Sequence, residues 1–241
     1  KLKKALRLRK LKIANCWFST FLLTQNYSDV EKDFIDKCKF LKSLGAKVIG
    51  VSEQSFSIQQ KQVAIFGNKP VLTELQWYQL CSGLNRLGEK AKEYGISLCF
   101  HHHMGTVVQT AQEIDKLMAE TDEDKVGLLY DSGHLAYCGE DYVALLKKHI
   151  KRVRHVHLKD IRSQVIREVK NRGLSFLDGV RMGTFTVPGD GDIDFEPIFE
   201  ILSQNNYSGW LLVEAEQDPA LANPLEYAIK ARKYIKQKIN L

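Results

Sequence analysis

The sequence has few of the features that mark a disulfide-rich, zinc-ribbon or membrane protein. Its five cysteines are widely scattered and include no C-x-x-C pair, which argues against a disulfide scaffold or a zinc ribbon. No apolar run approaches the ~18 residues that suggest a membrane span, and no apolar stretch with a cleavage site lies near Lys1. We therefore expect a cytoplasmic protein with reduced thiols and no membrane contact.

The distribution of charge does not indicate a nucleic acid partner. The formal net charge is +6, and the excess is concentrated in the opening residues 1–10 and the closing residues 230–241. Such runs are typical of solvated helix faces. The middle of the chain has no basic stripe interleaved with aromatic residues, so we expect no binding to nucleic acid.

Short apolar runs alternate with longer amphipathic stretches along the chain. The amphipathic stretches 29–44 and 73–94 are each followed by a glycine, Gly45 and Gly95, which is the expected helix stop before a strand. The alternation predicts a parallel sheet with helices outside it. The six predicted strands are 11–18, 46–51, 96–100, 126–130, 153–158 and 210–213.

The length and strand count allow two α/β architectures. With 241 residues, 44% hydrophobic composition and no linker, we expect one domain over residues 1–241. A closed (β/α)8 TIM barrel needs eight strands, so a barrel would mean that about two N-terminal βα units are absent from this chain. An open doubly wound sheet needs no missing unit. The placement of polar residues favours the barrel.

Metal-capable residues lie at the C-terminal ends of four of the six apolar runs. They are His101, Asp131, His157 and Glu214. Because active sites of parallel α/β proteins lie at the carboxyl ends of the strands, we expect these side chains to converge. Two carboxylates and two imidazoles suit Mn, Co, Fe or Zn better than Ca or Mg. For each residue alone, a helix cap or a loop hydrogen bond is the alternative.

Strand alternation predicts which side chains of each run face the cavity. His155, His157 and Lys159 share one side of their strand, and His155 lies deeper, where we expect a core hydrogen bond to satisfy it. His101 and His103 share a face with Cys99 if their strand persists. His102 would then turn outward or into the loop. Glu214 and Glu216 also share a face, with Glu214 nearer the strand.

Six stretches of the chain together carry a family resemblance. They are NCWFSTF (15–21), HHHMGTVVQT (101–110), DSGHL (131–135), HVHLKDIR (155–162), FTVPGDGDIDF (185–195) and LLVEAEQDPALANPL (211–225). This set resembles the inosose dehydratase family, which belongs to the xylose isomerase-like sugar isomerase/epimerase barrels. Members of the family begin with two further βα units, in agreement with the strand count. The resemblance implies a hydro-lyase of myo-inositol catabolism that removes water from 2-keto-myo-inositol (scyllo-inosose) through an enolate, giving a trihydroxycyclohexane-1,2-dione.

The resemblance also implies a metal site. Related barrels hold a divalent metal with Glu, Asp, His and Glu at successive strand ends, and the last three correspond to Asp131, His157 and Glu214. The first glutamate falls on His101, so this residue is either a fourth ligand or a base for proton transfer. Mn or Co is the expected ion, and the family resemblance also suggests a glutathione requirement.

Further residues are assigned to catalysis and substrate binding. His101, His103 and Lys159 are the candidate catalytic residues. The candidates for binding a small cyclitol substrate are His134, Glu216 and Trp17; Trp17 either stacks on the substrate ring or packs in the core. A homo-oligomer is compatible with these assignments.

Other functions remain as alternatives. A sugar isomerase or epimerase would use the same metal and an enediolate. An apurinic endonuclease of the same superfamily would need a larger ligand set and a basic groove, neither of which is visible, and a non-catalytic remnant is the third alternative.

Three other segments have plain interpretations. The VPGDGDIDF stretch reads as a turn followed by an N-cap at Asp192 or Asp194 rather than as a phosphate cradle, because it lacks the G-x-x-x-x-G-K-S/T pattern. Glu53, at another strand end, would bind a hydroxyl or face water. Residues 162–181 are expected to include a helix or an excursion over the barrel mouth.

Overall fold

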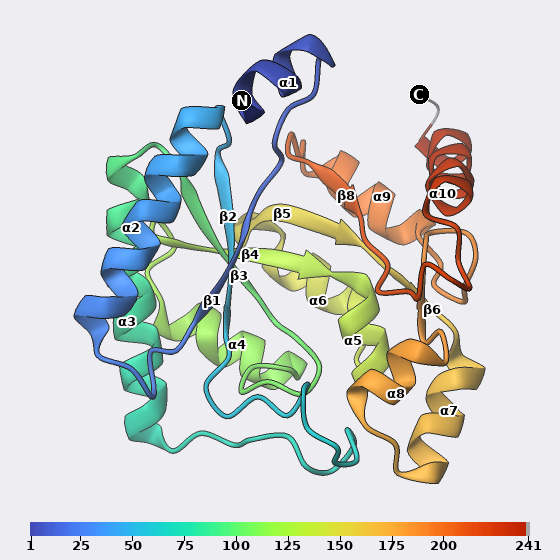
Figure 1. The fold of residues 1–241 in the computed structure, drawn as a ribbon. Helices are drawn as coiled ribbons and strands as arrows, with labels where there is room; N and C mark the ends of the chain where they lie inside the picture. Colours follow the sequence, from blue (N-terminus) through green and yellow to red (C-terminus); the bar gives the residue numbers. More distant parts are fainter. Residues whose placement is uncertain (240–241) are drawn as a thin grey trace.

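The main sheet consists of parallel strands, as the apolar runs predict. A computed structural model describes residues 1–239. Its main sheet has six strands in the order β1-β2-β3-β4-β5-β8, and every neighbouring pair is parallel (Figure 1). The strands are β1 Trp17–Thr20, β2 Val48–Glu53, β3 Ser97–His101, β4 Val126–Asp131, β5 Val153–Leu158 and β8 Leu211–Val213. Two short strands, β6 Asp160–Ile161 and β7 Phe185–Thr186, form a separate antiparallel pair.

Helices connect the strands, and the predicted stops are confirmed. Helix α2 ends at Leu44 with Gly45 in the left-handed conformation, and Gly95 has a positive φ of 68° just after α3. Thr73 caps α3 through a reciprocal pair with Gln76. The helices are α1 Leu2–Leu8, α2 Tyr27–Leu44, α3 Glu74–Glu93, α4 Ala111–Glu120, α5 Ser132–Cys138, α6 Tyr142–His149, the 3₁₀ turn Ile150–Arg152, α7 Ser163–Arg172, α8 Phe176–Arg181, α9 Glu196–Gln204 and α10 Pro224–Ile239. Across residues 1–239, the helices all fall short of the length and apolar character that a membrane crossing requires.

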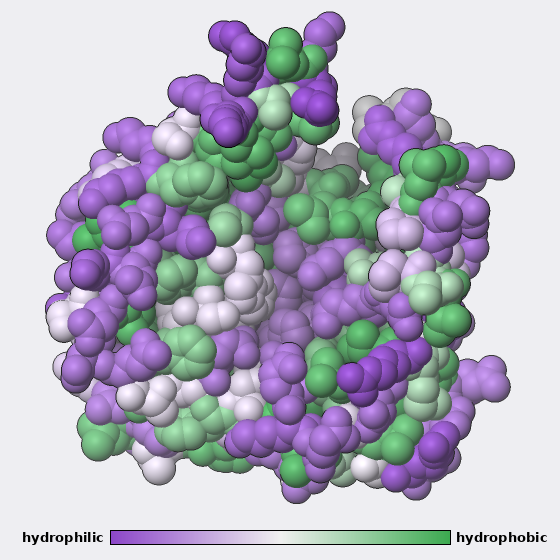
Figure 2. Space-filling model, viewed as in Figure 1, coloured by the Kyte–Doolittle hydropathy of each residue, from purple (hydrophilic) through white to green (hydrophobic). Residues whose placement is uncertain are grey.

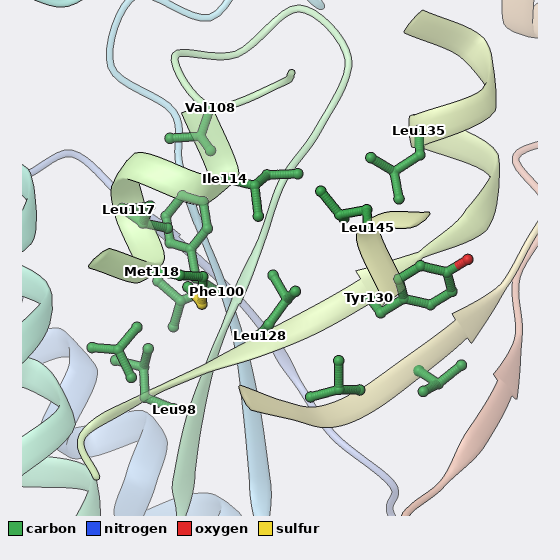
Figure 3. Close-up of a cluster of buried hydrophobic side chains, with 14 of the residues drawn as sticks. Leu98, Phe100, Val108, Ile114, Leu117, Met118, Leu128, Tyr130, Leu135 and Leu145 are labelled. Atoms are coloured by element: carbon green, nitrogen blue, oxygen red, sulfur yellow. The ribbon is translucent and has the colours of Figure 1, made fainter. Parts of the chain in front are cut away.

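The outward faces of the central strands pack against the helix layer. Figure 3 shows Phe100 of β3 and Leu128 of β4 among the side chains of α4, including Ile114 and Leu117. Each of these apolar side chains is fully buried, which stabilises the fold by roughly 1.5–3 kcal/mol per residue. Because side chains alternate along a strand, the residues between them face the opposite side of the sheet. This arrangement places the polar residues of β3 and β4 on the inner face.

The first strand begins later than predicted. The sequence predicts a strand over residues 11–18, whereas β1 spans Trp17–Thr20. Pairing with β2 starts at Trp17 opposite Gly50, and β1 has no second neighbour in the sheet. An apolar run without a partner strand on either side cannot complete its backbone hydrogen bonds, so the preceding residues form an extended connection from α1.

The sheet formed by the described residues is open between β1 and β8. Each of these strands pairs with one neighbour only, so they form the two edges of the sheet (Figure 1). Figure 2 shows that this face of the molecule is hollowed between the two sides and that hydrophilic residues line the depth of the hollow. The six strands predicted from the apolar runs are therefore present, and in this order they form part of a barrel.

The segment after β5 forms the predicted excursion. Residues 162–181 contain α7 and α8, which confirms the expected helix. The glycine-rich turn that follows wraps the carboxylate of Asp160, which accepts hydrogen bonds from the backbone N–H groups of Gly189, Gly191 and Ile193 at 2.9–3.1 Å. The turn therefore binds a side chain of the protein itself.

The predicted cap on α9 is displaced by one residue. The N-cap position is Phe195, and Asp194 accepts a hydrogen bond of 3.0 Å from the backbone N–H of Glu196 at the first helical residue. Asp192 instead accepts from the backbone N–H of Ser163 at the start of α7, at 2.7 Å. The two aspartates thus anchor two different helices.

Candidate metal centre and active site

The four strand-end residues converge on one point. His101 ends β3, Asp131 ends β4, His157 lies in β5, and Glu214 directly follows β8. One ligand atom from each of these residues lies within 4.8 Å of the ligand atoms of the others. The expected convergence is therefore present, and it depends on the parallel sheet bringing four carboxyl ends to the same edge.

Asp131 uses its two oxygens differently. Its Oδ1 accepts a 2.9 Å hydrogen bond from the backbone N–H of His134 and so caps α5. Its Oδ2 has no hydrogen-bond partner and lies 3.4 Å from Nε2 of His101 and 3.5 Å from Nδ1 of His157. The cap fixes the orientation of the carboxylate and leaves one buried oxygen available.

Two of the other three donors, His157 and Glu214, also present unpaired atoms to the same place. The Nδ1 of His101 contacts the backbone carbonyl of His102, which leaves Nε2 with a free lone pair. Nδ1 of His157 and Oε2 of Glu214 lie 2.6 Å apart without hydrogen-bond geometry. Buried polar atoms are rarely unpaired, and here several face one point. This donor set of two imidazoles and two carboxylates fits a divalent cation.

The protonation states agree with a site built for positive charge. Burial lowers the pKa of His101, so its imidazole is neutral. Burial also acts to lower the pKa of His157, but the carboxylates of Asp131 and Glu214 outweigh it and raise the pKa to about 9. Burial opposes ionisation of Glu214, yet the ammonium of Lys159 and His157 hold its pKa well below the usual value. In the absence of a cation, a proton on His157 therefore supplies positive charge that a metal would replace.

A second cluster lies beside the first. His103, His134 and Glu216 also have ligand atoms within 4.8 Å of one another. The Nζ of Lys159 is 2.8 Å from Oε1 of Glu216 and 3.0 Å from Nε2 of His134. A lysine ammonium therefore already provides the positive charge here. Among the described residues, unpaired donor atoms occur in the first cluster and not in the second.

Lys159 belongs to both clusters. Its side chain is fully buried, and its Nζ lies 3.4 Å from Oε2 of Glu214 and 3.8 Å from Oδ2 of Asp131. Burial acts to lower its pKa, but Glu214, Asp131 and Glu216 outweigh burial and raise it, so the amine is a stable ammonium. Its charge links the metal cluster to the second cluster.

Aromatic side chains form the wall of the second cluster and its opening. The ring of His103 lies 3.6 Å from that of His134 and 5.7 Å from that of Phe176, centroid to centroid. Trp17 lies edge-on to His101, with 5.4 Å between ring centroids, and its residue is 42% exposed. Core packing, one of the two interpretations of Trp17, is therefore wrong, because the indole lies at the open side of the cluster.

Two residues of the site are not among the candidates predicted from the sequence. Gln59, in the long connection between β2 and α3, contacts Nδ1 of His103 and donates to the carbonyl of Met104 at 3.0 Å. Ser132 accepts from the backbone N–H of Lys159 at 3.1 Å and donates to its carbonyl at 2.8 Å. No pattern of residue spacing predicts that a glutamine in a loop lies beside the second cluster. Ser132 could have been found only as part of the DSGH motif.

His155 is buried as predicted, but the expected core hydrogen bond is absent. Neither of its ring nitrogens has a partner among the described residues. Its register partner on β4 is Leu129, which offers no polar group. Burial, followed by the charge of His157, lowers the pKa of His155 to about 3, so it remains neutral.

His102 lies in the loop directly after β3; its ring is fully buried there, and Nε2 accepts a 3.3 Å hydrogen bond from the backbone N–H of Asp131. One other expectation needs correction. Glu53 neither faces water nor lacks partners. It is fully buried and accepts hydrogen bonds from the Thr20 hydroxyl and the backbone N–H groups of Leu22 and Ser55 at 2.9–3.0 Å.

Comparison with known proteins agrees with this architecture. Residues 1–238 match the family model of the xylose isomerase-like TIM barrel. The chain is 65% identical over 241 residues to an inosose dehydratase of Clostridium perfringens and 58% identical over 241 residues to one of Clostridium botulinum. In both cases the match covers 100% of this chain and 81% of the relative.

A solved structure supports the fold. The IOLI protein with a bound zinc atom superposes with a TM-score of 0.74 at 18% identity, covering 99% of this chain and 81% of that one. The sequence relatives match this chain over its whole length at high identity, and the neighbour shares its fold. The chain belongs to the inosose dehydratase family of xylose isomerase-like TIM barrels.

Proposed function

We propose that this protein is a hydro-lyase that removes water from 2-keto-myo-inositol (scyllo-inosose) to give a trihydroxycyclohexane-1,2-dione. The observation that carries the proposal is the position of Lys159, whose buried ammonium lies between four metal-capable donors and a second cluster of imidazoles and carboxylate. The names of the sequence relatives support the same reaction.

The reaction makes three chemical demands. A proton next to the ketone must be removed, the negative charge of the enolate must be stabilised, and the departing β-hydroxyl must be protonated. The first demand needs a base, the second a positive centre and the third an acid. One residue in a single protonation state cannot be both the base and the acid. The two adjacent clusters offer all three.

We assign His101, Asp131, His157 and Glu214 as ligands of a divalent metal, with Mn²⁺ or Co²⁺ as the proposed ion. When bound, such an ion supplies Lewis-acid stabilisation of the enolate oxygen. His101 is assigned as a ligand rather than as the base because its Nδ1 is held by the carbonyl of His102, and Nε2 belongs to the converging donor set.

His103 is the proposed base and Lys159 the proposed acid. Burial, with the nearby His134, holds the pKa of His103 well below its usual value, so its imidazole is neutral and can accept the proton from carbon. A neutral imidazole always has one ring nitrogen without a proton, and the Nδ1 of His103 contacts both the carbonyl of Met104, at 3.2 Å, and the side-chain nitrogen of Gln59. The ammonium of Lys159 can donate to the leaving hydroxyl.

The remaining polar groups orient the substrate. Glu216 and His134 lie beside the acid, and both can bind ring hydroxyls of a cyclitol. Trp17 presents an exposed indole at the mouth, where the apolar face of the ring can stack. A small polyhydroxylated ketone is therefore the proposed substrate class.

The proposal is tested by incubating the metal-free protein with scyllo-inosose after adding Mn²⁺, Co²⁺, Zn²⁺ or no metal. We expect a product with ultraviolet absorbance and the mass of the substrate less one water, formed fastest with Mn²⁺ or Co²⁺. Asp131→Asn should abolish both metal retention and turnover. Parallel assays with and without glutathione test the expected glutathione requirement. Rearrangement of ketoses without loss of water would instead support a sugar isomerase or epimerase.

A further inference from the structure

We propose that Gly133 is a positioning residue. Because glycine has no side chain, it leaves the space that the methylene groups of Lys159 occupy as this side chain extends toward the two clusters. This inference rests on the proposed function, because it gives a structural cause for the position of the proposed acid. It also assigns a role to a residue that has no polar atom in its side chain and cannot itself contact a substrate through one.

The contact between the two residues leaves no room for a methyl group. A Cβ atom built on Gly133 would lie 2.5 Å from Cγ of Lys159 and 2.8 Å from both its Cβ and its Cδ. Carbon atoms in ordinary contact lie about 3.5–4.0 Å apart. Gly133 stands in the first turn of α5 and does not have a positive φ. The requirement for glycine is therefore one of space and not of backbone conformation.

The stem of Lys159 cannot move aside freely. Its backbone N–H and carbonyl are both bonded to the hydroxyl of Ser132. The side chain is fully buried, and the ammonium lies 4.6 Å from the ring centroid of Phe185. An added methyl group at position 133 would therefore displace the Lys159 side chain together with its backbone or the first turn of α5, because the Cβ of Lys159 moves only with its backbone.

Four consecutive residues thus act on the same region. Asp131 presents Oδ2 to the metal cluster, Ser132 holds the backbone of Lys159, Gly133 leaves space for its stem, and His134 contacts its ammonium. Helix α5 starts directly after β4, and its first turn lies beside the end of β5 and β6 (Figure 1). The DSGH motif is in this way a single support for the acid and the metal.

The test compares Gly133→Ala with Gly127→Ala. Displacing a catalytic group by about 1 Å can cost about 100-fold in rate, so we expect Gly133→Ala to lower kcat by about that factor. KM should change much less, because the other substrate contacts remain, and metal content should be unchanged.

Gly127 is the matched control: it lies in the same β4 to α5 segment, and an added Cβ would meet the side chain of Arg154 at 2.6 Å, outside either cluster. Gly127→Ala should leave kcat unchanged. Wild-type kcat in Gly133→Ala would overturn the inference.

A stability cycle tests the contact independently of activity. Lys159→Ala removes the Cγ and Cδ that a methyl group at position 133 would meet. The loss of melting temperature caused by Gly133→Ala should therefore be smaller in the Lys159→Ala background than in the wild type. Equal losses in both backgrounds would overturn the inference. If the wild-type enzyme fails to dehydrate scyllo-inosose, the proposed function fails, whereas the cycle still decides whether Gly133 positions Lys159.

Discussion

The ammonium of Lys159 lies 2.8 Å from a carboxylate oxygen of Glu216, although the two residues are 57 positions apart in the chain. The lysine is fully buried, and Glu216 is largely so. Burial opposes ionisation of Glu216, but Lys159 and His134 hold its pKa well below the usual value. Removing one partner of such a pair leaves the charge of the other without its compensating partner.

Neutralising Glu216 is therefore expected to impair catalysis without removing the metal. Glu216→Gln keeps the shape of the side chain but removes the charge that holds the ammonium and orients the substrate. We expect kcat/KM to fall by about 100-fold or more, in the range that positioned acid–base groups contribute. Metal content after dialysis should match the wild type. Glu226→Gln, an exposed glutamate of α10, serves as the control and should have wild-type activity. Loss of the metal from Glu216→Gln would show that Glu216 acts as a ligand instead.

The role of His101 can be separated from that of the neighbouring histidines by metal analysis. His101→Gln removes one imidazole from the four-residue donor set, so we expect the metal to be lost on dialysis and its affinity to fall by about 10- to 100-fold or more. Elemental analysis of dialysed protein measures this directly. His149→Gln, which affects a histidine paired with Asp115 far from the donor set, should retain the metal. A His101→Gln protein that keeps its metal but has no turnover would identify His101 as the base.

The sequence predicts the parallel sheet and the metal cluster because both depend on local rules. The apolar runs give the six strands of the main sheet, and a polar residue at the end of four of these runs marks the carboxyl end of the strand. His101, Asp131, His157 and Glu214 are found in this way, since the parallel arrangement alone brings them together.

Other features depend on contacts between distant segments, and no local pattern encodes them. Gln59 reaches His103 from a long loop whose path is set by packing. The buried state of His102 depends on the backbone of Asp131, which lies on the next strand. The start of β1 depends on where β2 offers a partner, and not on its own apolar run.

The carboxylate of Asp160 is expected to be a major stabiliser of the loops beside the site. It accepts backbone hydrogen bonds from Ile161, Gly189, Gly191 and Ile193 at 2.8–3.1 Å. Asp160→Asn would turn an amide group toward N–H donors, so at least one donor would lose its acceptor. Since a hydrogen bond to a charged group contributes about 1.5–3 kcal/mol, we expect the free energy of unfolding to fall by roughly 3 kcal/mol. Urea unfolding measures this change.

The matched control for Asp160 is Asp194. It lies in the loop between β7 and α9 that donates to Asp160, is exposed, and accepts one backbone hydrogen bond at the start of α9. Asp194→Asn should cost no more than about 1 kcal/mol, as expected for a helix cap. Equal effects of the two substitutions would mean that the enclosed carboxylate of Asp160 has no special role.

Asp190 is expected to make the attachment of α10 sensitive to acid. Its carboxylate accepts hydrogen bonds of 2.6 Å from Arg162 and from the hydroxyl of Thr186, and it pairs with Lys230 of α10. Burial acts to raise the pKa of Asp190, but Lys230 and Thr186 outweigh it and lower the pKa below the ordinary value. A lowered pKa in the folded state means that the stabilisation is fully present above the unfolded pKa, near ~3.9, and is lost as the pH falls through the folded pKa.

The measurement is the difference in unfolding free energy between the wild type and Asp190→Asn, taken from urea unfolding at a series of pH values. At pH 7 we expect the variant to be less stable by about 1–3 kcal/mol, because hydrogen bonds to an ionised carboxylate are lost. The difference should stay constant down to about pH 5 and shrink below about pH 4, because the wild-type carboxyl then becomes protonated as well. Asp33→Asn, on the exposed side of α2, should show no difference at any pH. A difference for Asp190→Asn that persists unchanged into strong acid would mean that the side chain stabilises α10 through its shape and not through its charge.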